Sequence, residues 1–164
     1  MRVPIKLIAP SVVLLLLGVL GCSKTNPRVV TTLNTSATLS GALPSNPMQG
    51  RVITSWIDKN AGTMSTLYGN DIAVQYARTG AQTGYPAGSA LSVVTWTQQE
   101  DPRWFGGNIP AAAKSVEYVS IAADKHYTYQ RYEGSPLKQV DQEAGVTPND
   151  RESYLLSQRA AVMP

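Results

Sequence analysis

Residues 90–97 read ALSVVTWT, a run of branched and aromatic side chains with little strict alternation between polar and apolar positions. Branched and aromatic residues favour strands, and a short apolar run without alternation is typical of a strand buried on both faces. The run follows residues 85–88 (YPAG), which place proline and glycine as a tight turn requires. This stretch therefore predicts a strand that is buried on both faces and begins directly after a turn.

Two runs downstream also predict strands. Residues 116–121 (VEYVSI) are mostly branched or aromatic, and residues 127–132 (YTYQRY) alternate cleanly. In the second run, Tyr127, Tyr129 and Arg131 fall on one face, because successive side chains in a strand point to opposite sides.

The segments on either side are less uniform. Residues 52–57 (VITSWI) are ambiguous between a strand and the start of a helix. Residues 64–79 carry apolar side chains at spacings of three and four and predict a helix, with a break at Gly69-Asn70. Residues 151–161 predict a last helix. A helix followed by several short strands favours an α+β fold, mostly an antiparallel β-sheet packed with a few helices.

The N-terminus has the pattern of a secretion signal. Arg2 and Lys6 precede an apolar run whose uninterrupted part, residues 12–20, is far shorter than the roughly 20 residues that span a bilayer. It ends in Val-Leu-Gly-Cys at Cys22, which resembles the bacterial lipobox, and Cys22 is the one cysteine of the chain. An ordinary signal peptide with a chance cysteine is the alternative.

The lipobox sets the expected organisation and location. We expect a signal peptide over 1–21, a flexible tether over 22–50 that is rich in Thr, Ser, Asn and Pro, and one folded domain over 51–164. The thiol of Cys22 would carry acyl chains, so membrane lipid is the expected partner. Ser23, rather than an aspartate, follows the cysteine, which favours the outer membrane facing the periplasm.

Composition excludes several classes of function. Without Arg2 and Lys6 the chain keeps 12 basic residues against 11 acidic ones, and the basic residues are scattered singly, so no nucleic-acid partner is expected. Once Cys22 is acylated, no thiol remains for a disulfide, a thiolate nucleophile or a cysteine zinc site.

Three phrases occur in order along the chain: LYGNDIAV at 67–74, YPAGSAL at 85–91 leading into Val94-Thr95-Trp96, and VEYV at 116–119. In this order and spacing the chain resembles the cytochrome P-460 family of small periplasmic proteins over roughly Val52 to Pro136. The resemblance implies an antiparallel sheet domain with packed helices, often a homodimer. It also implies c-type haem bound through a CxxCH motif near the C-terminus, and in some members a lysine crosslink and oxidation of hydroxylamine.

The chain departs from that family at the haem site. Its C-terminal segment, RESYLLSQRAAVMP at 151–164, contains no cysteine and no histidine, and the strand after YPAG contains no lysine. The first expectation is therefore a membrane-anchored lipoprotein that has lost covalent haem and serves a ligand-binding or structural role, with no catalytic residue and no metal site.

A non-covalent haem protein that binds or oxidises small nitrogen species, such as nitric oxide or hydroxylamine, is the alternative. His126, the one histidine of the chain, is then the candidate axial ligand, with the nearby tyrosines as further candidates. The other interpretation of His126 is a turn-exposed side chain.

Two further features carry open alternatives. Residues 98–110 (QQEDPRWFGGNIP) predict a long loop in which Arg103, Trp104 and Phe105 either form a ligand pocket or cover the sheet edge, with Arg103 paired to an acid. Glu117 and Glu133 lie on or just after strands, but their spacing gives no reason to expect an acid–base pair.

Overall fold

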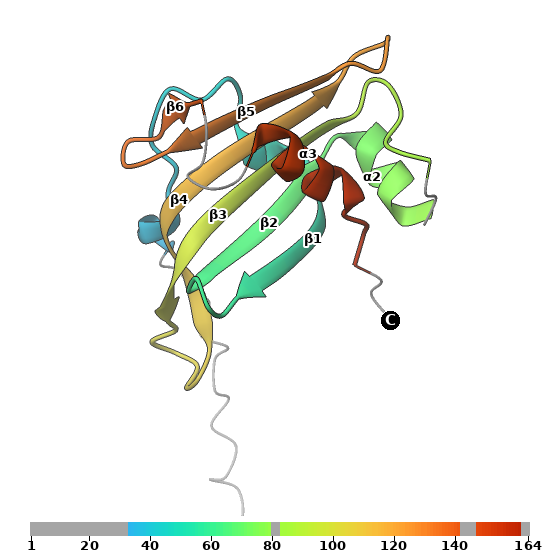
Figure 1. The fold of residues 1–164 in the computed structure, drawn as a ribbon. Coiled ribbons are helices and arrows are strands. Elements are labelled where there is room, and N and C mark those ends of the chain that lie inside the picture. The colour runs from blue at the N-terminus through green and yellow to red at the C-terminus, as the bar shows by residue number, and fades with distance from the viewer. Residues whose placement is uncertain (1–32, 80–82, 142–146, 162–164) are drawn as a thin grey trace, which may run out of the picture. The chain divides into compact units, whose positions relative to one another are not determined.

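A six-stranded antiparallel sheet in the order β1-β2-β3-β4-β5-β6 forms the centre of the computed structural model, which describes residues 33–79, 83–141 and 147–161 (Figure 1). Each strand pairs with its neighbour in sequence, so the sheet is a meander. The strands are β1 (Arg51–Asp58), β2 (Thr63–Gly69), β3 (Ala90–Glu100), β4 (Asn108–Ile121), β5 (Tyr127–Glu133) and β6 (Lys138–Val140).

Two α-helices and two short 3-10 helices accompany the sheet in the described residues: α2 (Asp71–Thr79), α3 (Pro148–Ser157), η1 (Thr35–Ala37) and η2 (Pro47–Gln49). Residues Asn34–Pro164 form one compact unit. The predicted α+β class with a mostly antiparallel sheet is confirmed.

The predicted strand at 90–97 lies in the middle of the sheet, as β3. It pairs with β2 on one side and β4 on the other, and Val93 and Val94, which point to opposite faces, are both fully buried. The sheet therefore has two packed faces, which explains the absence of polar alternation in the sequence.

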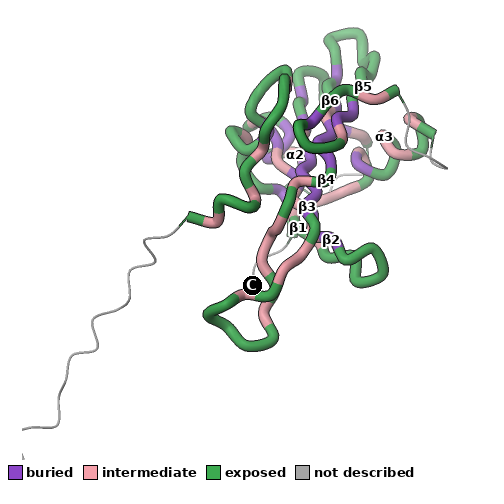
Figure 2. The backbone as a smooth tube through the Cα atoms, turned by 90° about the vertical axis from the view of Figure 1, so that its left-hand side faces the viewer, coloured by how far each residue is buried: buried purple, intermediate pink, exposed green. Residues whose placement is uncertain are grey.

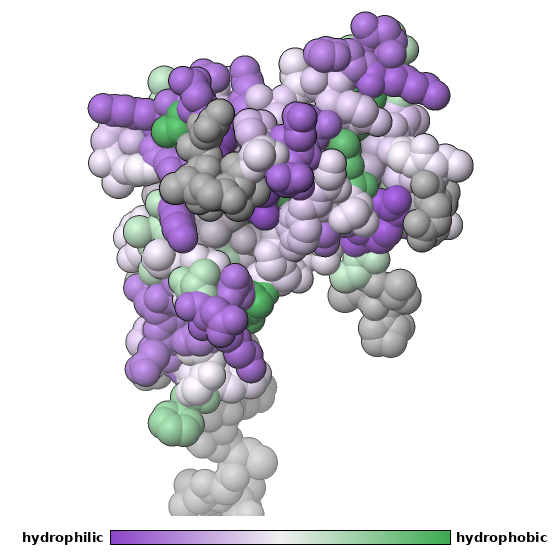
Figure 3. Space-filling view, viewed as in Figure 1, coloured by the Kyte–Doolittle hydropathy of each residue, from purple (hydrophilic) through white to green (hydrophobic). Residues whose placement is uncertain are grey.

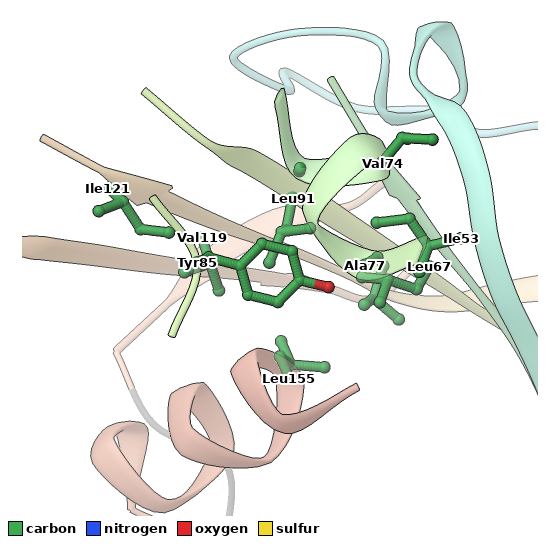
Figure 4. Close-up of a cluster of buried hydrophobic side chains, with 11 residues drawn as sticks. Ile53, Leu67, Val74, Ala77, Tyr85, Leu91, Val119, Ile121 and Leu155 are labelled. Carbon is green, nitrogen blue, oxygen red and sulfur yellow. The ribbon is translucent and has the colours of Figure 1, made fainter. Parts of the chain in front are cut away.

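Helices α2 and α3 cover one face. Its core comprises side chains from β1 to β4, from α2 and from the turn at Tyr85, and Leu155 of α3 points into it (Figure 4). The Tyr85 hydroxyl donates to the carbonyl of Gln158 at 2.9 Å. This hydrogen bond and Leu155 together hold α3 against the helix-covered face.

The opposite face is covered by the segment that precedes β1. Ala37, Leu39 and Leu43 pack against a second core cluster that contains Val94 and Trp96. The Trp96 indole donates to the carbonyl of Ala37 at 3.1 Å, a second hydrogen bond joins this segment to β3 at the carbonyl of Pro47, and a third joins it to Leu137.

Residues 34–50, which the sequence placed in a flexible tether, are thus part of the folded unit. Their alanine and leucine side chains complete a second core, which composition alone did not reveal.

The predicted helix at 64–79 is wrong in its first half. Residues 63–69 form β2, in which Ser65 and Leu67 point to one face while Met64 and Tyr68 pack on the other. The helix begins only at Asp71, where the side chain of Asn70 accepts a hydrogen bond from the amide of Ala73 at 3.0 Å. The ambiguous run at 52–57 is strand, within β1.

The predicted loop at 98–110 is shorter in the structure, because strand extends into both of its ends. β3 continues to Glu100 and β4 begins at Asn108, so only residues 101–107 connect them. The resulting β3–β4 hairpin projects beyond the rest of the sheet (Figure 1), and its far end is exposed while buried residues concentrate in the middle of the sheet (Figure 2).

Candidate functional site

The helix-covered face contains a buried cluster of charges centred on Glu117. This residue is 1 % exposed and stands opposite Arg131 across the β4–β5 pair. The guanidinium of Arg151 from α3 donates to both carboxylate oxygens, at 2.7 and 2.8 Å, and the Tyr129 hydroxyl donates to one of them at 2.7 Å. Arg131 Nη1 lies 3.5 Å from the same oxygen.

Arg131 also joins Glu117 to Glu133. Its Nε donates to Glu133 Oε1 at 2.8 Å, so the two glutamates flank one guanidinium although their sequence spacing gave no sign of this. Two carboxylates thus face two guanidinium groups, Arg131 and Arg151, and the cluster carries no net formal charge.

The cluster is suited to holding α3 in place and not to proton transfer. Burial is the largest cause that raises the pKa of the Tyr129 phenol, and the neighbouring Glu117 carboxylate raises it further. The pKa of Arg151 is also raised, because its bonds and attraction to Glu117 outweigh its own desolvation. Glu117 is nearly inaccessible and both its oxygens are occupied, so it has no oxygen available for a substrate.

A pocket of about 290 Å³ opens on the sheet beside Trp96. We call it the Trp96 groove. It is mostly apolar, with hydroxyls of serine and threonine at intervals, and it is lined by Ser55, Trp56, Ile57, Met64, Ser65, Thr66, Trp96 and Pro110. Met64, Thr66 and Trp96 belong to the face opposite the helices, where the segment before β1 covers β3 and β4 and leaves part of β1 and β2 open.

His126 lies in the turn between β4 and β5 and is exposed. Its backbone amide donates to Asp124 and its carbonyl accepts from the amide of Ala122. It does not line the Trp96 groove. Of the side chains that line the groove, only Met64 has a group that serves as an axial ligand of haem iron. The volume of about 290 Å³ lies at the low end of the range for pockets that bind drug-sized ligands. The residues present therefore do not fit a haem.

The two aromatic residues of the loop do not line the Trp96 groove and do not cover a sheet edge. Trp104 and Phe105 are exposed at the end of the β3–β4 hairpin. The expected pairing of Arg103 with an acid is present, to Asp101, at 3.9 Å.

The candidate lipid anchor Cys22 lies outside the described residues. Within them, no three His, Cys, Asp or Glu side chains gather where they could hold a metal ion. Likewise, none of the helices in that part of the chain has the length and apolar character needed to cross a membrane.

Comparison of the chain with protein-family models and with curated proteins found no match.

Proposed function

We propose that this chain is a lipoprotein of the bacterial outer membrane, anchored through acylated Cys22 and facing the periplasm. In this proposal its cytochrome P-460-like domain has lost covalent haem and binds a small, mostly apolar ligand in the Trp96 groove. The observation that carries the binding role is the groove itself, an apolar concavity on the sheet face opposite the helices.

The chemistry of the groove supports a ligand of modest size. Indole, thioether and aliphatic groups supply apolar contact from Trp96, Met64 and Ile57, while Ser55 and Thr66 add hydroxyls at the rim. The Ser55 and Thr66 hydroxyls lie 3.0 Å apart and bond to each other. A ligand with one polar group can accept from or donate to this pair while its apolar part lies against Trp96.

The anchor rests on the sequence Val19-Leu20-Gly21-Cys22, with its charged and apolar segments in register. Mass analysis of the mature chain tests it. The expected N-terminal residue is Cys22 with its acyl groups, and Cys22→Ala is expected to abolish partition into the detergent phase. A chain that starts elsewhere, or that carries no lipid, refutes the anchor and leaves the binding role in place.

Titration with N-phenyl-1-naphthylamine, a neutral apolar fluorophore, tests the binding role. Wild-type protein should enhance its emission, and Ile57→Asn should weaken binding roughly tenfold, since one exposed aliphatic contact of about 1.4 kcal/mol is lost. Ile72→Asn on α2 is the matched control, because Ile72 is similarly exposed and lies outside the groove. Equal weakening by both variants, or no binding by the wild type, refutes the groove.

Haemin titration of the same protein tests whether the chain binds haem without a covalent bond. We expect no sharp Soret band beyond that of free haemin, and identical spectra for wild type and His126→Ala. A band that shifts on reduction and is lost in His126→Ala would replace the proposal with a non-covalent haem protein.

A further inference from the structure

The far end of the β3–β4 hairpin presents two large aromatic side chains to solvent. Trp104 is 75 % exposed and Phe105 is fully exposed, and apolar atoms are visible at the lower end of the hairpin in Figure 3. Other apolar patches are also visible on the face shown in that figure, so the distinguishing feature of the tip is that two large aromatic side chains are exposed next to each other. Leaving a large side chain in water forgoes roughly 1.5–3 kcal/mol relative to burying it, so an adjacent exposed pair indicates a surface that is covered in use.

The loop does not need these side chains for its own structure. The amide of Asp101 donates to the carbonyl of Gly107 at 2.8 Å, and the amide of Gly107 donates to the carbonyl of Trp104 at 2.9 Å. The amide of Arg103 donates to the Asp101 carboxylate at 2.9 Å. Gly106 takes the left-handed conformation, with φ at 76°, that lets the chain turn back. The backbone is satisfied locally, and the aromatic side chains are left pointing outward.

The hairpin lies at the end of the fold where the chain enters from its N-terminus. The side-chain amide of Asn34 donates to the carbonyl of Pro110 at 2.6 Å. The side-chain oxygen of Asn34 accepts from the side-chain amide of Gln99 at 3.5 Å. From Gln99 the hairpin extends at most roughly 17 Å to Trp104. A chain from Cys22 to Asn34 can extend at most about 40 Å. An anchor at Cys22 therefore leaves the hairpin tip within reach of the same bilayer surface.

The size of the tip favours a bilayer over a protein partner. A Trp and a Phe bury about 150–250 Å² each, whereas a stable protein interface needs about 800 Å² from each partner. Tryptophan also prefers the interfacial region of membranes, where its apolar ring and polar N–H are both accommodated. Arg103 near the tip is offset by Asp101, and Glu100 precedes them, so attraction to anionic lipid is not the driving force.

We propose that Trp104 and Phe105 insert into the interfacial region of the membrane that holds acylated Cys22, giving the folded unit a second point of attachment. The proposal rests on the lipid anchor stated above. Two attachment points would fix the orientation of the sheet, with the β3–β4 hairpin toward the lipid and the β4–β5 turn away from it.

Bromine quenching of tryptophan tests the insertion. The full chain is purified from membranes and combined with phosphatidylcholine vesicles that contain lipids brominated near the headgroup end of the acyl chain. We expect a quenched component of tryptophan emission that is absent in Trp104→Phe, since Trp56 and Trp96 lie within the sheet. Phe105→Ser should weaken the insertion equilibrium roughly tenfold, and Ile72→Ser should leave it unchanged.

The outcomes separate the insertion from the anchor. Quenching that depends on Trp104, with lipid found on Cys22, supports both. The same quenching without lipid on Cys22 supports the insertion and removes the anchor. An acylated chain held on vesicles with no Trp104-dependent quenching overturns the insertion, and leaves the tip to contact a protein. Quenching that is abolished by 0.5 M salt, or that appears only when anionic lipid is added to the phosphatidylcholine vesicles, would also overturn it, because the tip is close to neutral.

Discussion

Neutralising Glu117 should destabilise the fold more than any surface change of the same kind. Glu117→Gln keeps the size of the side chain and removes one negative charge from the buried cluster. Arg131, which is 5 % exposed, keeps Glu133 as a partner, but Arg151 loses the two-point contact that its guanidinium makes with the carboxylate. One guanidinium charge is then left without a counter-charge next to the core.

Breaking a buried ion pair by removing one partner costs about 3–5 kcal/mol. Arg151 is partly exposed, with 23 % of its side chain accessible, so water compensates some of this loss and we expect the lower end, about 3 kcal/mol. For a folded unit of this length 1 kcal/mol shifts the melting temperature by roughly 4 °C. The expected drop is therefore about 12 °C.

Urea unfolding followed by far-UV circular dichroism measures this loss, and the m-value shows whether unfolding stays two-state. Asp71→Asn is the matched control: Asp71 pairs with Arg51 at 3.4 Å, and its side chain is largely exposed, so its loss should cost less than about 0.5 kcal/mol. The double variant Glu117→Gln with Arg151→Gln should be more stable than the sum of the two single losses predicts. A Glu117→Gln protein within 0.5 kcal/mol of the wild type, or strict additivity with Arg151→Gln, would refute a coupled buried cluster.

Three further changes test other parts of the structure. The pKa of Tyr129 is higher in the folded chain than in the unfolded chain, so its contribution to stability is complete below about pH 10 and is lost as pH rises through the raised pKa. Tyr129→Phe should therefore make the loss of stability with rising pH shallower in urea titrations at pH 9–12. An unchanged slope would contradict this. Ser89→Ala should raise the free energy of unfolding by about 1 kcal/mol, since the Ser89 hydroxyl is buried without a hydrogen-bond partner among the described residues; a loss measured by the same unfolding assay would contradict it. Leu155→Ala should cost about 2–5 kcal/mol, because Leu155 is fully buried between α3 and the sheet, and faster amide exchange in α3 should accompany the loss.

Sequence patterns predicted correctly those elements whose apolar spacing fits only one kind of secondary structure. The strand at 90–97 and the alternating strand at 127–132 are of this kind, and Tyr129 and Arg131 do share a face, beside Glu117. The segment at 64–69 satisfies two periods, because Met64, Leu67 and Tyr68 fit a helical spacing while both faces of the actual strand are buried. A strand covered on both faces loses the polar positions that would separate the two interpretations.

The buried cluster was beyond sequence reasoning for a different reason. Glu117 meets Arg131 through strand register and meets Arg151 through the docking of a helix 34 residues away. Neither of these two contacts can be inferred from the spacing of nearby residues in the sequence. The available signal was the single charge in each run that predicts a strand, at Glu117 in residues 116–121 and at Arg131 in residues 127–132, because charges are rarely buried unless they are paired.

The two faces of the sheet differ in a way that bears on function. On one face α3 is held against the sheet by Glu117 and Leu155. On the other face the covering segment contacts β4, β3 and part of β2, and the Trp96 groove remains over parts of β1 and β2. Pro110 lines this groove and also accepts the hydrogen bond from Asn34, where the chain enters the fold. The groove therefore lies near the end of the fold from which the β3–β4 hairpin projects, so the proposed insertion of the hairpin tip would place the groove close to the membrane.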